Sequence, residues 1–185
     1  MKAGVLALQG DFREHSLVLD DAGATPVEVR AVEHLADVDC LVIPGGESTT
    51  ISKLAHIAGL VEPIRERAAA GMPIFGTCAG MIVMAERVLD GEPLLGLVDI
   101  TVRRNAYGRQ VDSFEADVPV DGIEDPIRAV FIRAPWVEEV GACVTVLAEL
   151  EGRPVALEQG NLLVASFHPE IVREQRLHEY FLEKV

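Results

Sequence analysis

The sequence predicts a three-layer α/β fold with a mostly parallel central sheet. In the first half of the chain, short apolar segments alternate with amphipathic ones, an order typical of parallel strands joined through helices. Residues 40–43 are continuously apolar, as expected of a strand covered on both faces. The chain has 185 residues, 49% of them hydrophobic, which is enough for one domain with a substantial core. We expect that domain to span residues 1–185.

The expected elements follow from apolar periodicity and from Gly and Pro at their ends. In the first half we expect strands at 2–8, 26–30, 40–43 and 73–75, and helices at 13–22, 48–58, 61–70 and 79–89. Helices then become rare, and we expect a mixed or antiparallel extension from strands at 97–104, 112–118 and 128–132. The last elements expected are a hairpin of 144–150 with 154–158, a strand at 162–166 and a helix at 173–184.

Composition excludes several classes of protein. Asp and Glu number 30 against 16 Lys and Arg, giving a net charge of −14 without a basic cluster, so phosphate-backbone binding is not expected. No apolar stretch approaches the length of a membrane span, and the first residues lack the pattern of a signal peptide. The three cysteines include no Cys-x-x-Cys pair, which argues against a disulfide framework and against zinc. We therefore expect a cytoplasmic protein in which Cys40 and Cys143, in strand-like segments, are inert.

Cys78 is the strongest candidate for a chemical role. It lies at the centre of Gly76-Thr77-Cys78-Ala79-Gly80, between a predicted strand and a predicted helix. This is the cysteine counterpart of the Gly-x-Ser-x-Gly nucleophile elbow, in which small neighbours permit a sharp turn. The start of a helix also favours the thiolate form of the nucleophile. The alternative interpretation is a buried structural cysteine.

A histidine and an acid follow ninety residues later. His168 comes at the end of a predicted strand that Pro169 terminates, and Glu170 lies two residues further on. Cysteine, histidine and acid together form an activated-nucleophile arrangement. Each also has an ordinary interpretation, as a strand-end histidine and a solvated loop carboxylate.

A third motif follows the apolar strand at 41–43. The pair Gly45-Gly46 can direct backbone N–H groups towards an anion, as an oxyanion hole requires. A plain strand-to-helix turn with Ser48 as N-cap is compatible with that interpretation. A phosphate loop is disfavoured, because Lys53 comes too late for the required spacing.

In this order, the three motifs resemble those of class I (triad) glutamine amidotransferases. Within that family they are most similar to the glutaminases that serve pyridoxal 5′-phosphate synthases. The resemblance covers about residues 4–182, and its most specific segments are 104–110 and 132–135.

The resemblance implies that L-glutamine is hydrolysed to L-glutamate and ammonia through a Cys78, His168 and Glu170 triad and a glutamyl thioester. It implies an oxyanion hole formed by the backbone N–H groups of Gly46 and Ala79. The glutamine contacts that it implies come from Gly46, Glu47, Ser48, Arg104, Ile132 and Arg133. Strand alternation sends Arg103 and Arg104 to opposite faces, so we expect only Arg104 in the site. A surface salt bridge is the alternative for Arg104 and Arg133.

The resemblance also implies a partner. This is a TIM-barrel synthase subunit, assembled as twelve glutaminases with twelve synthase chains, which receives ammonia through a tunnel and makes pyridoxal 5′-phosphate. No cofactor or metal site is expected in this chain. His15 is expected on a solvated helix face or at a partner surface. Three alternatives remain: a glutaminase of another synthase such as imidazole glycerol phosphate synthase, a non-catalytic sensor on the same fold, and a cysteine hydrolase such as a protease.

Overall fold

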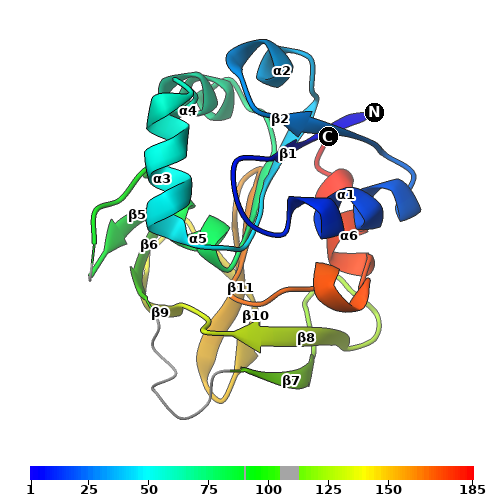
Figure 1. Cartoon of the computed structure of the whole chain (residues 1–185). Helices are drawn as coiled ribbons and strands as arrows, with labels where there is room; N and C mark the ends of the chain where they lie inside the picture. Colours follow the sequence, from blue (N-terminus) through cyan, green and yellow to red (C-terminus); the bar gives the residue numbers. More distant parts are fainter. Residues whose placement is uncertain (90, 105–112) are drawn as a thin grey trace.

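A seven-stranded sheet separates two layers of helices in the computed structural model, which describes residues 1–89, 91–104 and 113–185 (Figure 1). Five neighbouring strands are parallel, and a hairpin adds two antiparallel strands at one edge. The order across the sheet is β10 (Thr145–Leu150), β11 (Arg153–Gln159), β12 (Leu162–Ala165), β4 (Ile74–Thr77), β3 (Cys40–Ile43), β1 (Lys2–Leu6) and β2 (Thr25–Val29).

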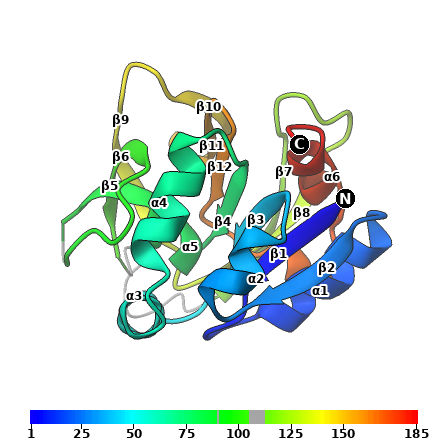
Figure 2. The same ribbon diagram turned by 90° about the horizontal axis from the view of Figure 1, so that it is seen from above.

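The helices cover both faces of this sheet (Figure 2). One face carries α3 (Ser48–Ile57), α4 (Val61–Ala69) and α5 (Ala79–Met84), with the short α2 (Val32–Ala36) in contact with α4. The other face carries α1 (Phe12–Asp21) and α6 (Arg176–Leu182). Strand alternation divides the core accordingly, because Leu41 and Ile43 pack in the first layer and Cys40 and Val42 in the second. The predicted three-layer α/β fold is confirmed.

Two small sheets follow the elbow instead of extending the central sheet. One contains β5 (Ala85–Val88), β6 (Val98–Arg103) and β9 (Trp136–Val140), and the other pairs β7 (Ser113–Val118) with β8 (Ile127–Ile132). The prediction that these middle segments extend the main sheet was therefore wrong. The antiparallel extension is the predicted β10–β11 hairpin, whose turn places Glu151 and Gly152 at positive φ, as a tight hairpin turn requires.

The helix expected over 79–89 is shorter than predicted. It ends at Met84, and residues 85–88 form β5, which pairs with β6 in parallel. The Arg87 guanidinium reinforces this pairing through Asp99 and Thr101 of β6. An apolar run does not by itself distinguish a helix from a strand, so a partner distant in sequence decides the conformation.

Other differences from the prediction concern two missed elements, the start of the closing helix and the position of Cys143. Helix α2 and strand β9 were not predicted, and the closing helix begins at Arg176, after a single turn of 3₁₀ helix, η1 (Glu170–Val172). Cys143 was expected in a strand but lies exposed in the turn before β10.

None of the described helices is long and apolar enough to cross a membrane.

Gly80, in the first turn of α5, meets the backbone at the end of β3. A Cβ atom at this position would lie 2.1 Å from the carbonyl oxygen of Ile43, although the backbone conformation of Gly80 is ordinary. Helix α5 therefore packs on β3 at a distance that only glycine allows.

We expect Gly80→Ala to lower the free energy of unfolding by about 3 kcal/mol, because the methyl group forces α5 away from β3. Gly59→Ala is the control: Gly59 has positive φ but no atoms near its absent Cβ, so only backbone strain of about 1 kcal/mol applies. Urea unfolding of both variants measures the difference. Equal losses of stability would show that the contact with Ile43 imposes no constraint.

Candidate active site

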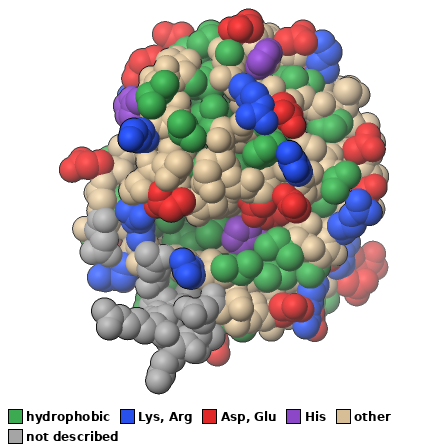
Figure 3. All heavy atoms as spheres, in the orientation of Figure 1, with side chains coloured by type: hydrophobic (Ala, Val, Ile, Leu, Met, Phe, Trp, Pro, Cys, Tyr) green, Lys and Arg blue, Asp and Glu red, His purple; other side chains and the backbone are tan. Residues whose placement is uncertain are grey.

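A cavity of about 550 Å³ opens at the edge of the sheet where the parallel strands end, the usual position of chemistry in α/β folds. On the face drawn in Figure 3, Lys and Arg side chains lie scattered among Asp and Glu. The cavity is lined by Asp11, Gly46, Glu47, Ser48, Cys78, Ala79, Ile82, Arg104, Ser113, Ile132, Arg133, His168 and Ile171. Each site residue predicted from sequence lines it except Glu170, which lies behind His168.

Cys78 occupies the elbow between β4 and α5. Its φ of 46° and ψ of −101° lie outside the ordinary regions for a residue with a side chain, as expected of a strained nucleophile turn. The backbone N–H donates to the carbonyl of Ala165 at 2.8 Å, which ties the elbow to β12. The Sγ atom lies 3.8 Å from the carbonyl oxygen of Ile132. The predicted strand–turn–helix is present, with its thiol at the cavity.

His168 follows β12 and contacts two carboxyl groups through one ring nitrogen. Its Nδ1 atom lies 2.7 Å from Oε1 of Glu170 and 2.9 Å from Oδ2 of Asp11. With Nδ1 engaged in this way, Nε2 is left to interact with Cys78, which lines the same cavity. Glu170 is fully buried at the start of η1, and so the predicted partner of the imidazole is a core carboxyl group and not a solvated one.

The charges of this cluster are coupled. Burial opposes protonation of His168, but hydrogen bonds with Asp11, Cys78 and Glu170 outweigh it and raise the pKa of the imidazole. Burial likewise opposes ionisation of Asp11, yet its hydrogen bonds with His168 and Glu170 bring its pKa below the ordinary value. Burial raises the pKa of Glu170 to about 8, and the neighbouring Asp11 adds to that rise. The arrangement therefore stabilises a charged imidazolium beside an ionised Asp11.

The glycine loop lines the cavity next to His168. Gly46 has a φ of 145°, and a Cβ atom there would lie 2.6 Å from Oε1 of Gln9. The same Gln9 oxygen accepts the backbone N–H of Glu47 at 2.7 Å. Ala79, which lines the same cavity, begins α5, and the first N–H groups of a helix have no acceptor within it. Two backbone segments able to provide oxyanion donors thus lie at one cavity.

Helix α3 is capped by Glu47 and not, as expected, by Ser48. The Glu47 carboxylate accepts the backbone N–H groups of Thr49 and Thr50. Hydrogen bonds with these threonines, the largest from Thr49, lower the pKa of Glu47 to about 2 against the smaller opposing effect of burial. Ser48 is the first residue of the helix and lies buried at the cavity.

Arg104 lines the cavity, whereas Arg103 does not. Nη2 of Arg104 lies 3.2 Å from Oε1 of Glu47, and Nε of Arg103 donates to Glu138 at 2.6 Å. Ile132 and Arg133 bring the end of β8 to the cavity, and Arg133 has a φ of 46°. The rest of the specific segment predicted at 104–110 lies outside the described residues.

His15 was expected in solvent or at a partner surface, and both expectations were wrong. It is fully buried on α1, where Nε2 lies 2.9 Å from Oγ1 of Thr77 and Nδ1 lies 2.9 Å from Nε2 of His178. Burial, reinforced by the proximity of His178, lowers the pKa of His15, and burial also lowers the pKa of His178 to about 4. A layer of neutral histidines therefore lies beneath the cluster.

Several functional candidates escaped sequence reasoning. Asp11 directly contacts His168, and Ile82, Ser113 and Ile171 line the cavity. The position of Asp11 in the sequence could have indicated a place in the site, because it follows the first predicted parallel strand and such strands end at a common edge. The others carry no chemical signature. Burial raises the pKa of the Cys40 thiol to about 12, which agrees with the inert role predicted for it.

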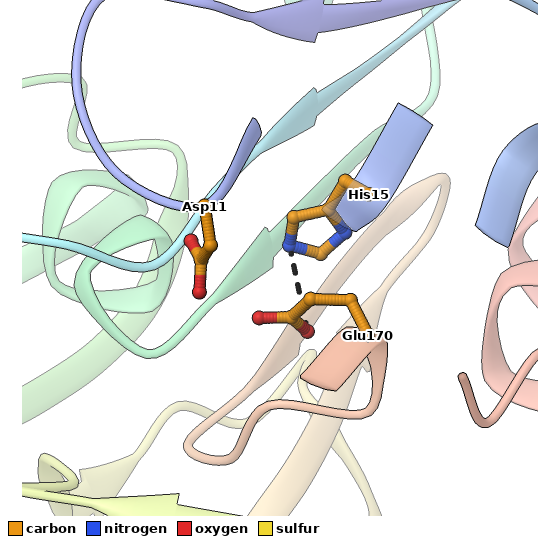
Figure 4. Close-up of side chains that lie close together, drawn as sticks. All are labelled: Asp11, His15 and Glu170. Carbon is orange, nitrogen blue, oxygen red and sulfur yellow. Dashed lines mark ion pairs between the residues drawn. The ribbon is translucent and has the colours of Figure 1, made fainter. Parts of the chain in front are cut away.

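Asp11, His15 and Glu170 place one ligand atom each within 4.8 Å of one another, a spacing that could hold a metal ion (Figure 4). His15 approaches Glu170 with Nε2 at 3.5 Å from Oε2. Both ring nitrogens of His15 are already hydrogen-bonded, and both carboxyl groups face Nδ1 of His168. A metal here would have to compete with those hydrogen bonds, so the cluster fits a proton network better than a metal site.

A family model described as the SNO glutamine amidotransferase family matches residues 5–185. This chain belongs to that family. It is 59% identical to "Pyridoxal 5′-phosphate synthase subunit PdxT" of Acidothermus cellulolyticus, over the whole chain and 93% of the relative. It is 58% identical to the protein of the same name from Streptomyces avermitilis, over 98% of the chain and 92% of the relative.

Solved structures agree with this family assignment. A structure titled "Crystal structure of glutamine amidotransferase" is 49% identical, with a TM-score of 0.95, and the match covers 98% of this chain and 97% of the other. PurLQS from Thermotoga maritima gives a TM-score of 0.73 at 17% identity, covering 99% and 95% of the two chains, and this likeness shows a shared fold alone.

We expect the buried His178 to make stability depend on pH. Its folded pKa of about 4 lies below the ordinary 6.5, so the unfolded chain takes up the proton first as pH falls. Stability from this residue is complete above about pH 6.5 and declines towards pH 4, by up to about 3 kcal/mol. In the non-titrating variant His178→Gln, the decline in unfolding free energy should be smaller by that amount. Parallel pH dependences in urea unfolding would contradict this.

Proposed function

We propose that this chain hydrolyses the side-chain amide of L-glutamine to L-glutamate and ammonia, with Cys78, His168 and Glu170 as a catalytic triad. The observation on which the proposal rests is the strained Cys78 elbow beside a buried histidine whose Nδ1 is held by carboxyl groups. Membership in a glutamine amidotransferase family supports this choice among cysteine-dependent reactions.

In the first half of the reaction, the Cys78 thiolate attacks the carboxamide carbon of glutamine. The carbonyl oxygen becomes an oxyanion that accepts hydrogen bonds from the backbone N–H groups of Gly46 and Ala79, each worth about 3 kcal/mol. The carbon–nitrogen bond then breaks, and His168 donates its proton to the leaving ammonia. The product on the enzyme is a glutamyl thioester.

In the second half, His168 is neutral and acts as a base. It takes a proton from water, whose oxygen attacks the thioester carbon, and the carbon–sulfur bond breaks to release glutamate and the thiolate. The raised pKa of His168 suits the first half, because the imidazolium must persist until ammonia leaves. Glu170 orients the ring through its contact with Nδ1.

Glutamine itself needs partners for its α-carboxylate and α-ammonium groups. Arg104 is suited to the carboxylate, since a guanidinium binds carboxylates bidentately, and Glu47 supplies an anion for the ammonium. Gly46, Ser48, Ile132 and Arg133 complete the proposed contacts, and all of them line the same cavity. The Arg104–Glu47 ion pair, at 3.2 Å, keeps both charged groups at the cavity wall.

We further propose that the ammonia passes to a pyridoxal 5′-phosphate synthase subunit, a TIM barrel assembled with this chain in twelve copies of each. The name shared by the two relatives, at 58% and 59% identity, supports this partner. An enzyme that released ammonia freely would waste glutamine, so coupling to an acceptor fits the chemistry. The proposed location is the cytoplasm, and a single glutaminase domain is proposed for residues 1–185.

We expect Cys78→Ala to abolish glutamate release from glutamine, because no other group can form the thioester. Cys143→Ala, which removes an exposed thiol outside the cavity, should retain full activity. The assay measures glutamate with and without the synthase subunit. No glutamate release by the wild-type chain, even with an active synthase subunit, would disprove the glutaminase assignment. Activity that the synthase subunit does not change would point to another ammonia acceptor.

Arg104→Gln should raise the KM for glutamine roughly 30-fold with little change in kcat, because a charge-assisted contact to bound substrate is lost. The adjacent Arg103→Gln removes the same charge from a surface ion pair, and its effect should stay below about threefold. Steady-state kinetics separates the two parameters. Equal effects from both variants would mean that Arg104 acts only through general electrostatics.

A further inference from the structure

Two carboxyl groups from opposite ends of the chain face one nitrogen of His168. Asp11 Oδ2 lies 2.9 Å and Glu170 Oε1 lies 2.7 Å from Nδ1. The Glu170 side chain is completely buried and the Asp11 side chain is 19% exposed. A triad needs a single acid at this nitrogen, so Asp11 is in excess of what the proposed reaction requires.

We infer that Asp11 is a second positioning residue for His168, which shares with Glu170 the work of orienting the ring and stabilising its charged form. The inference rests on the proposed glutaminase function. It assigns to Asp11 a role exerted through the imidazole and not through direct contact with glutamine.

The backbone around Asp11 is built to hold this position. Gly10 has a φ of 99°, and a Cβ atom there would lie 1.8 Å from the carbonyl oxygen of Gly45. A Cβ atom on Gly45 would lie 2.2 Å from Cε1 of His168 and 3.1 Å from Oδ2 of Asp11. The two glycines thus allow the β1–α1 loop, the β3–α3 loop and the imidazole to pack together.

The side chain of Asp11 does not cap helix α1. It occupies the N-cap position of α1, where an aspartate commonly accepts a backbone N–H, but its side chain makes no such capping bond. The carboxylate turns to His168 instead. Substitution by asparagine therefore removes the charge without removing a helix cap.

The charges around His168 favour Asp11 as its ionised partner. The titratable groups that face it are Asp11 from the β1–α1 loop, Glu170 from η1, Cys78 from the elbow and His15 from α1. Burial keeps His15 neutral and raises the pKa of Glu170, whereas the hydrogen bonds of Asp11 outweigh its burial and lower its pKa. At neutral pH the negative charge beside the imidazolium is therefore centred on Asp11, and Glu170 supplies a second, more protonated acceptor.

The first test measures the pKa of His168 directly and does not depend on enzymatic activity. In a Cys78→Ala background, NMR titration of the histidine Cε1 resonances gives the pKa of His168, identified through its loss in His168→Gln. Asp11→Asn should lower that pKa by about one pH unit, because an opposite charge within hydrogen-bond distance is removed. Glu14→Gln is the matched control, since Glu14 is an exposed acid in the first turn of the same helix. Asp11→Ala repeats the measurement should Asp11→Asn not fold.

The second test uses the pH dependence of kcat/KM for glutamine. In Asp11→Asn the alkaline limb should move about one pH unit lower, which corresponds to a loss of up to about tenfold at pH values on that limb. Since either acid can partly replace the other, Asp11→Asn combined with Glu170→Gln should lose more activity than the product of the two single losses. A role confined to folding would leave the alkaline limb in place.

An unchanged His168 pKa and an unchanged alkaline limb in Asp11→Asn would overturn the inference. A wild-type chain without glutaminase activity would instead overturn the proposed function. In that event the NMR titration still decides whether Asp11 controls His168.

Discussion

The site depends on a close backbone contact between α5 and β3. Gly80 packs against the carbonyl of Ile43, and a Cβ atom on Gly76 would lie 2.7 Å from the backbone of Gly80. Where three backbone segments meet without intervening side chains, the turn between them has little freedom to relax. This packing retains the unfavourable φ of Cys78, so that the thiol faces the cavity and not the core.

A second constraint is the burial of ionisable groups beneath that turn. His168, Asp11 and Glu170 come from different elements, and each would lose hydration if it were buried without a partner. Their mutual hydrogen bonds offset that loss by favouring opposite charges on His168 and Asp11. The neutral pair of His15 and His178 separates this charged cluster from the aromatic core around Phe75 and Phe181. The polarity of the site thus decreases in steps from the cavity towards the core.

The scaffold and the site are separate parts of this architecture. The central sheet brings the ends of β1, β3, β4 and β12 to one edge, and the turns beyond those strands supply the glycine loop, the elbow and the histidine. PurLQS shares this fold at 17% identity, so the same arrangement of strands forms from a largely different sequence. The small sheets of β5–β6–β9 and β7–β8 frame the cavity through Arg104, Ile132 and Arg133.

The sequence by itself determined the features that depend on local spacing. Small residues around Cys78 specify the elbow, and alternation at the end of β6 sends Arg103 and Arg104 to different surroundings. The strand before His168 ends at Ala165 and not, as expected, at Pro169. Only the tertiary structure decided where α5 ends, that His15 is buried and that Asp11 reaches His168. These outcomes depend on contacts between distant segments: 157 residues separate Asp11 from His168, and 163 separate His15 from His178. Periodicity reports which face of an element is apolar, but only the packing of the layers determines which side chains meet there.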